Sequence, residues 1–193
     1  MNFKAYDILS SLVPGFIMLL SCLPFLGYEY DKDYVIGYTA IAFGLGYLLN
    51  TLGGWLEYFY FFTWGGMPSS NLLDGKCIKR IKVYNYTSIK DNLKAKTSNQ
   101  NPCNKELFNI AMRNVFISKD NRAEDFSNSY AFARTMLTCA ILSSIVIIVT
   151  YYDDWRAYLA IPITLIFWYR AKQRAYYFAK EILLIYSEKE NIK

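Results

Sequence analysis

Two polar residues interrupt an apolar stretch of the sequence, YLLNTLGGWLEYFYFF at residues 47–62. Asn50 carries an amide that donates and accepts hydrogen bonds, and Glu57 carries a carboxylate that can pair with a cation. Gly46 and Gly54 flank the amide at a spacing of four residues, and the carboxylate follows it by seven. On a helix these four positions share roughly one face, which predicts close helix packing or a polar passage at this face.

The two interpretations give these side chains different partners. In the packing interpretation, Asn50 hydrogen-bonds to a neighbouring helix and Glu57 pairs with Arg134 or a neighbouring Lys. Antiparallel neighbours would bring Glu57 and Arg134 to a similar depth. In the pore interpretation, the same face meets its equivalents around an oligomer axis and Glu57 favours cations. Contact with lipid head groups or solvent is a third interpretation. The sequence leaves all three open.

The usual catalytic groups are missing from the sequence. It contains no His, which removes the commonest general base and a major metal ligand. Its four Cys, at 22, 77, 103 and 139, have no CxxC spacing and no His partner, so we interpret them as reduced thiols. No nucleophile elbow, phosphate loop or close acidic pair within an apolar run is present. We therefore expect no enzymatic activity, no metal and no other cofactor.

Long apolar runs dominate the chain. Hydrophobic residues make up 54% of the 193 residues and charged residues 19%, below the ~25% of a typical soluble domain. Runs without charge occupy 8–27, 34–56 and 135–152, each long enough for a hydrocarbon core of about 30 Å. A shorter run at 155–169 predicts a fourth span, with a buried or interfacial helix as the alternative. The letters LLSC at 19–22 leave open a cleaved lipoprotein signal, which would leave three spans.

The charges of the connecting segments predict an orientation. Residues 28–33 carry three acids and one base, and residues 153–156 carry two acids and one base. By contrast, residues 66–134 carry twelve Lys or Arg against six acids, and residues 170–193 carry six against three. Basic loops stay in the cytoplasm. We therefore expect a multi-pass protein of the bacterial inner membrane with both termini and the middle segment cytoplasmic.

These patterns predict an all-α membrane protein with four transmembrane helices, a cytoplasmic insert between the second and third, and an amphipathic C-terminal helix. The expected divisions are a first helix pair, the insert, a second helix pair and the C-terminal helix, at 1–65, 66–133, 134–169 and 170–193. Apolar residues at helical spacing predict a helix over 104–117 in the insert, and residues 77–89 fit either a short strand pair or a helix. The insert is too polar to form a large core alone, so we expect it to pack on the membrane face, the C-terminal helix or a neighbouring subunit.

Basic residues gather where the C-terminal helix and the insert approach the membrane. Two interpretations are open for them: contact with anionic lipid or a partner, and a purely topological role, which we favour for the C-terminal helix. These residues are Arg170, Lys172, Arg174, Lys79 and Arg80. The positive charge does not by itself indicate nucleic acid, and we do not expect direct nucleic-acid binding.

The opening YDILSSLVPGFIMLL and the later LGGWLEYFYF and WGGMPSS resemble the small multi-pass membrane accessory proteins of type VI-B CRISPR–Cas systems, found in phage-defence loci. The resemblance covers the four-span layout and roughly the first seventy residues. Another accessory group of those systems is described by an Arg-x4-His motif, and this chain, which has no His, would belong with the group that lacks it. The resemblance implies a membrane effector that modulates an RNA-guided RNA nuclease, by permeabilising the inner membrane.

We therefore expect an oligomeric inner-membrane effector of antiviral defence that perturbs or permeabilises the membrane. One alternative is a non-conducting scaffold that recruits a partner through its basic insert. A second is a small transporter or channel subunit, although the sequence shows no internal repeat. The expected partners are membrane lipids, further copies of the chain, and a nuclease or other defence protein.

Overall fold

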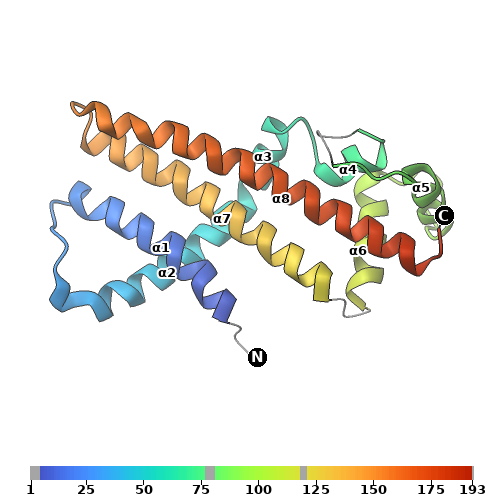
Figure 1. The fold of residues 1–193 in the computed structure, drawn as a ribbon, viewed down its shortest axis with the longest axis horizontal. Helices are drawn as coiled ribbons and strands as arrows, with labels where there is room; N and C mark the ends of the chain where they lie inside the picture. Colours follow the sequence, from blue (N-terminus) through green and yellow to red (C-terminus); the bar gives the residue numbers. More distant parts are fainter. Residues whose placement is uncertain (1–4, 77–80, 118–120, 193) are drawn as a thin grey trace. The chain divides into compact units, whose positions relative to one another are not determined.

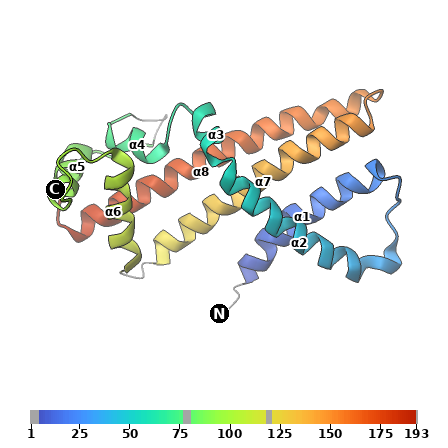
Figure 2. The same ribbon diagram turned by 180° about the vertical axis from the view of Figure 1, so that it is seen from behind.

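The computed structural model describes residues 5–76, 81–117 and 121–192, and these residues form helices and connecting loops without a β-strand (Figures 1 and 2). The α-helices are α1 (Ala5–Phe25), α2 (Val35–Trp55), α3 (Glu57–Thr63), α4 (Pro68–Leu73), α5 (Tyr86–Ala95), α6 (Asn104–Ile117), α7 (Asn121–Thr150) and α8 (Ala160–Lys189). Two short 3₁₀ helices, η1 (Lys32–Tyr34) and η2 (Trp155–Leu159), precede α2 and α8. Part of the segment expected as a strand pair or helix, residues 77–80, lies outside the described residues.

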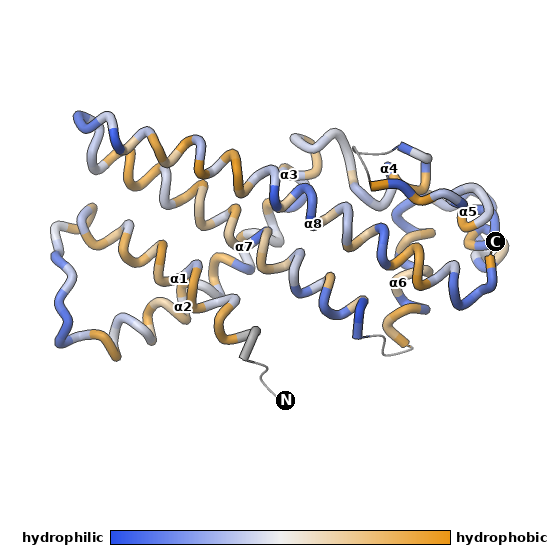
Figure 3. Tube along the Cα trace, viewed as in Figure 1, coloured by the Kyte–Doolittle hydropathy of each residue, from blue (hydrophilic) through white to orange (hydrophobic). Residues whose placement is uncertain are grey.

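Three helical segments are long and apolar enough to cross a membrane, Ile8–Phe25, Lys32–Trp55 and Asn121–Thr150. They contain the first three apolar runs of the sequence. Figure 3 shows hydrophobic residues along α1 and the later part of α7, and a hydrophilic loop between α1 and α2. The protein is therefore all-helical over the described residues, with three candidate membrane spans.

The chain divides into two compact units. Unit 1 consists of residues 1–57 and 131–171, and unit 2 of residues 58–130 and 172–193. Both α7 and α8 supply residues to each unit. The grouping joins the C-terminal segment with the insert, which was one of the three packing arrangements expected for the insert.

In unit 1, an aspartate caps the helical turn that follows the loop between α1 and α2, and another caps the turn that follows the loop between α7 and α8. Asp31 accepts a hydrogen bond from the backbone N–H of Asp33 at 3.0 Å, just before α2. Asp154 accepts one from the backbone N–H of Arg156 at 2.9 Å, just before α8. A carboxylate at the start of a helical turn satisfies a donor that the helix itself leaves without a partner. These acids therefore stabilise the helix starts, besides any effect on orientation.

Unit 2 has an apolar core formed by α4, α5, α6, the start of α7 and the end of α8. The helix predicted over 104–117 is present as α6, and it buries Leu107, Ala111 and Val115. The end of α8 buries Ile182 and Tyr186 against the same core. The other large members of the core are Leu72, Leu73, Ile81, Ile89, Leu93, Phe108, Tyr176, Leu183 and Ile185. The insert thus obtains a core by sharing it with the C-terminal helix.

Candidate functional site

The residues of α2 that the sequence singled out lie in unit 1, where Gly46 contacts α1 and Asn50 contacts α7. At the crossing with α1, Gly46 is buried, and a Cβ atom placed on it would lie 1.7 Å from the carbonyl oxygen of Ser11. Gly15 of α1 makes the reciprocal approach, since its Cβ would lie 1.7 Å from the carbonyl oxygen of Ala42. Only glycine permits backbones to come this close. Gly46 is therefore a helix-packing residue.

Asn50 meets α7 one turn further along α2. Its amide oxygen accepts a hydrogen bond from the Thr135 hydroxyl at 3.1 Å, and that hydroxyl also lies 2.9 Å from the carbonyl oxygen of Ala131. Thr135 is buried, whereas Asn50 occupies an exposed position on α2. The contact is an interhelical hydrogen bond of the type that stabilises helix pairs in membranes.

Two consecutive glycines near the C-terminal end of α2 bring this helix close to α7. A Cβ on Gly53 would lie 2.9 Å from the Thr138 hydroxyl, and one on Gly54 would lie 4.0 Å from the guanidinium of Arg134. Sequence reasoning selected Gly54 by its spacing from Asn50, but Gly53 makes the closer approach. The reason is that Asn50, Gly53 and Glu57 follow an i, i+3, i+7 stripe, which faces α7 more directly than an i, i+4 stripe.

Glu57 and Arg134 lie at ion-pair distance. The carboxylate oxygen of Glu57 is 3.5 Å from a terminal guanidinium nitrogen of Arg134, and the two side chains are 29% and 17% exposed. Glu57 follows the last residue of a candidate span by two positions, where the cost of a charge is lower than in the centre of a bilayer. The pair therefore holds the ends of two helices together.

The sequence did not predict the further polar contacts that α7 makes with α1 and α8. Cys139 donates its thiol to the carbonyl oxygen of Pro14 in α1 at 3.1 Å. On the side of α8, the Ser144 and Thr164 hydroxyls lie 2.7 Å apart, and Thr164 also donates to the carbonyl oxygen of Ala140 at 3.2 Å. The sequence shows only that small polar residues occur within the apolar runs, and this pattern does not identify their hydrogen-bond partners. Within unit 1, α7 is bonded through side chains to α1, α2 and α8.

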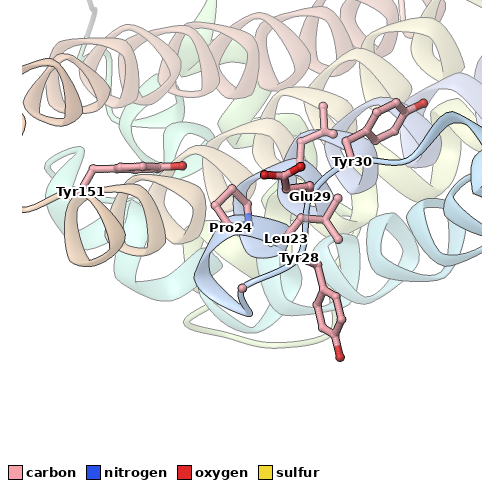
Figure 4. A pocket seen from close by; sticks show the side chains of 8 residues that line it. Leu23, Pro24, Tyr28, Glu29, Tyr30 and Tyr151 are labelled. Carbon is pink, nitrogen blue, oxygen red and sulfur yellow. The ribbon is translucent and has the colours of Figure 1, made fainter.

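A pocket of about 460 Å³ lies where the loop after α1 approaches the end of α7 (Figure 4). Its lining includes Leu23 and Pro24 of α1, the loop residues Glu29 and Tyr30, and Tyr151. Tyr28 and Tyr30 point in opposite directions in this view. The lining combines one carboxylate with tyrosine rings and aliphatic groups, which selects no particular ligand, so we assign none to this pocket.

The basic residues selected from the sequence lie in different places. Arg170 is exposed and belongs to unit 1, whereas Lys172 and Arg174 are half-buried and belong to unit 2. Lys79 and Arg80 lie outside the described residues. No group of three or more Cys, Asp or Glu side chains in the described part of the chain is arranged to hold a metal ion.

Ionic contacts on unit 2 tie its helices to one another. Hydrogen bonds from Lys90 and Asn104 lower the pKa of Asp74 below its usual 3.8, and the Lys90 ammonium lies 2.7 Å from that carboxylate. Lys96, after α5, pairs with Glu190, after α8, at 2.6 Å, and this hydrogen bond raises the pKa of Lys96. The contacts of Asp74 therefore link helices within the insert, and the Lys96–Glu190 pair links the insert to the end of the C-terminal helix.

No protein-family model, no curated protein and no solved structure matches this chain.

Proposed function

We propose that the protein is a membrane-anchored scaffold, in which unit 1 holds the chain in the bilayer and unit 2 recruits a partner at the cytoplasmic face. The observation that carries this proposal is the bonding of Asn50 in α2 and of Glu57, two residues after α2, to α7 of the same chain. Asn50 hydrogen-bonds to Thr135 and Glu57 lies at ion-pair distance from Arg134. Side chains used in this way stabilise a helix bundle and need no water-filled passage.

These contacts also weaken the argument for an oligomer. We expected further copies of the chain because Asn50 and Glu57 needed partners away from lipid. Thr135 and Arg134 supply such partners within one chain. The scaffold therefore functions with the helices of a single copy.

We propose four membrane crossings, with α8 supplying the fourth. Thr164 of α8 bonds to Ser144 and to the carbonyl oxygen of Ala140, both in the apolar part of α7. If α7 crosses the bilayer, the first half of α8 lies at the same depth beside it. Both acidic loops then lie outside, and the insert and both termini lie in the cytoplasm. Reporter fusions after Asp33, Asn99 and Lys189 test this topology, with only the first expected outside.

The partner of unit 2 is proposed to be a protein with an acidic surface. Unit 2 exposes basic side chains on the segment before α5, on α5 and on α6, including Lys82, Lys94 and Arg113. Charge complementarity steers association between such surfaces. For the process served, the proposal follows the resemblance described above, antiviral defence beside an RNA-guided nuclease.

Phage protection in bacteria that express the chain with such a nuclease tests the scaffold. Replacing Lys82, Lys94 and Arg113 together by Gln is expected to abolish the contribution of the chain to protection. The matched variant Asn50→Leu is expected to retain it, and membrane potential is expected to stay unchanged throughout. A membrane-permeabilising effector predicts the opposite: depolarisation that depends on the chain and changes with Asn50→Leu or Glu57→Gln.

A further inference from the structure

Helix α3 presents aromatic side chains on one face and buries them on the other. Phe62 is 83% exposed, and Tyr58 and Phe59 are also exposed, whereas Tyr60 is buried. Tyr60 stacks on the buried Trp64 with ring centroids 6.2 Å apart. Residues 58, 59 and 62 share a helical face through their three- and four-residue spacings. One face of α3 is thus buried, with Tyr60 against Trp64, and the other exposes large apolar groups.

The position of α3 along the chain limits what can cover that exposed face. The candidate span α2 ends at Trp55, and α3 begins at Glu57, so a single residue separates them. A helix that starts one residue after a span begins at the depth of the lipid head groups. Trp55, the last residue of α2, and Leu56, which links it to α3, are exposed as well. Tyr and Trp are enriched at this depth because they combine an apolar ring with a polar group.

A basic residue accompanies the aromatic face. The Lys105 ammonium of α6 donates to the Tyr58 hydroxyl at 3.0 Å and lies 5.5 Å from the centre of the Tyr58 ring. An ammonium carries three donors, so it can contact an anionic oxygen while it keeps this bond. A cation beside aromatic rings at head-group depth matches a leaflet that contains anionic phospholipid.

We propose that α3 is an interfacial helix that docks unit 2 on the cytoplasmic leaflet, with Phe59 and Phe62 among the acyl chains and Lys105 at the lipid phosphates. The inference rests on the membrane placement of α2 and not on partner recruitment by unit 2. Interfacial binding of this kind depends on buried apolar area and on attraction to anionic lipid.

A nitroxide depth measurement on the full chain tests this proposal. The four Cys are replaced by Ser, and single labels are introduced by Phe62→Cys, Tyr84→Cys and Ile41→Cys. The chain is reconstituted in vesicles of phosphatidylcholine and phosphatidylglycerol. Tyr84→Cys is the matched control for Phe62→Cys, because both positions hold aromatic residues of unit 2, which are 85% and 83% exposed. Ile41, an exposed residue within α2, reports on the span itself.

The Phe62→Cys label is expected to be severalfold more accessible to oxygen than to a water-soluble nickel complex, like the Ile41→Cys label, and the Tyr84→Cys label is expected to show the reverse. Replacing phosphatidylglycerol by phosphatidylcholine is expected to make the Phe62→Cys label shallower, and Lys105→Gln is expected to remove that difference. A Phe62→Cys label that is open to nickel, or shielded from both reagents, overturns the proposal. If the Ile41→Cys label still reports lipid, the failure belongs to α3 and not to the membrane placement.

Discussion

Units 1 and 2 place polar and apolar side chains in opposite ways. Unit 1 exposes large aliphatic residues such as Ile36 and Ile166, while it buries hydroxyl groups such as those of Thr138 and Ser143. Unit 2 buries Leu72, Leu93 and other aliphatic residues in a shared core and exposes charged side chains. Exposed aliphatic surface is costly in water but not in lipid, where helices associate through close packing and interhelical hydrogen bonds. The two units are therefore stabilised by different forces.

Each of the two longest helices contributes a charged segment to one unit and an apolar segment to the other. α7 begins with charged residues that belong to unit 2 and continues into an apolar segment that belongs to unit 1. α8 does the same in the opposite direction. A substitution is therefore expected to act through backbone contact and hydrogen bonding in unit 1, and through apolar burial in unit 2. The following predictions separate these two modes.

The largest effect is expected at the crossing of α1 and α2. Gly46→Leu would place side-chain atoms where the Ser11 carbonyl lies, and a Cβ alone would be 1.7 Å from that oxygen. Because a backbone atom cannot move aside cheaply, we expect a loss of more than about 4 kcal/mol in the free energy of unfolding of unit 1. Unfolding in mixed detergent measures it. Gly44→Leu is the control, since a Cβ at Gly44 meets nothing within 4 Å, and an equal loss there would refute the packing role.

The next effect is expected in the core of unit 2. Leu107 is fully buried on α6, and Leu107→Ala is expected to cost about 3 kcal/mol through lost burial and a cavity. Hydrogen exchange of α5, α6 and the end of α8 should accelerate. The apolar half of α7 should keep its protection, because its contacts are separate. Ile117→Ala, at an exposed position of the same helix, is expected to stay within about 0.5 kcal/mol of the wild type.

A smaller effect is expected at the ion pair of unit 1. Glu57→Gln removes the negative partner from the half-buried Arg134, and we expect a loss of about 1 kcal/mol, between the values for exposed and buried pairs. Detergent unfolding of unit 1 measures this as well. Glu29→Gln, in the exposed loop between α1 and α2, changes the net charge equally and should have no measurable effect. Equal stability of the Glu57→Gln variant and the wild type would mean that the pair contributes nothing to helix packing.

The smallest effect is a pH dependence confined to unit 2. Asp74 has a pKa lowered by hydrogen bonds from Lys90 and Asn104, so the folded state binds this proton less readily than the unfolded chain. Its contribution to stability is present above pH 3.8 and is lost as the pH falls through the lowered pKa. Asp74→Asn should lower the free energy of unfolding of unit 2 at neutral pH. It should also reduce the decline of this free energy as the pH falls, which unfolding measured across a pH series would show. Asp91→Asn, on the more exposed ion pair with Lys94, should leave that decline in place.

The helices of the chain followed closely from its sequence where one physical rule decides the outcome. Charge-free runs of bilayer length gave the candidate spans, and the apolar spacing of residues 104–117 gave α6 with its buried face. The approach of Glu57 to Arg134 could be anticipated because both end long apolar runs on what would be the same side of a membrane. Local pattern and charge suffice for these features.

Other features depend on how helices pack and could not be read from one sequence. Residues 58–62 are all aromatic, so their sequence does not indicate which of them are buried. In α3, however, Tyr60 is buried and Phe62 is exposed. The close crossing at Gly15 and Gly46 depends on the relative rotation of α1 and α2. Likewise, nothing local indicates that Ser144 would meet Thr164. Small residues permit such contacts, but only the packed arrangement selects them.

The most direct test of the central claim is ion flux through vesicles that contain the purified full chain. Vesicles of phosphatidylethanolamine and phosphatidylglycerol are loaded with a potassium gradient, and its decay is followed with and without protein. The account predicts that wild-type and Glu57→Gln vesicles hold the gradient as long as empty ones, because Asn50 and Glu57 bond to α7 within the chain. A leak that grows with the amount of protein and changes with Glu57→Gln would contradict the scaffold and establish a conducting role for these residues.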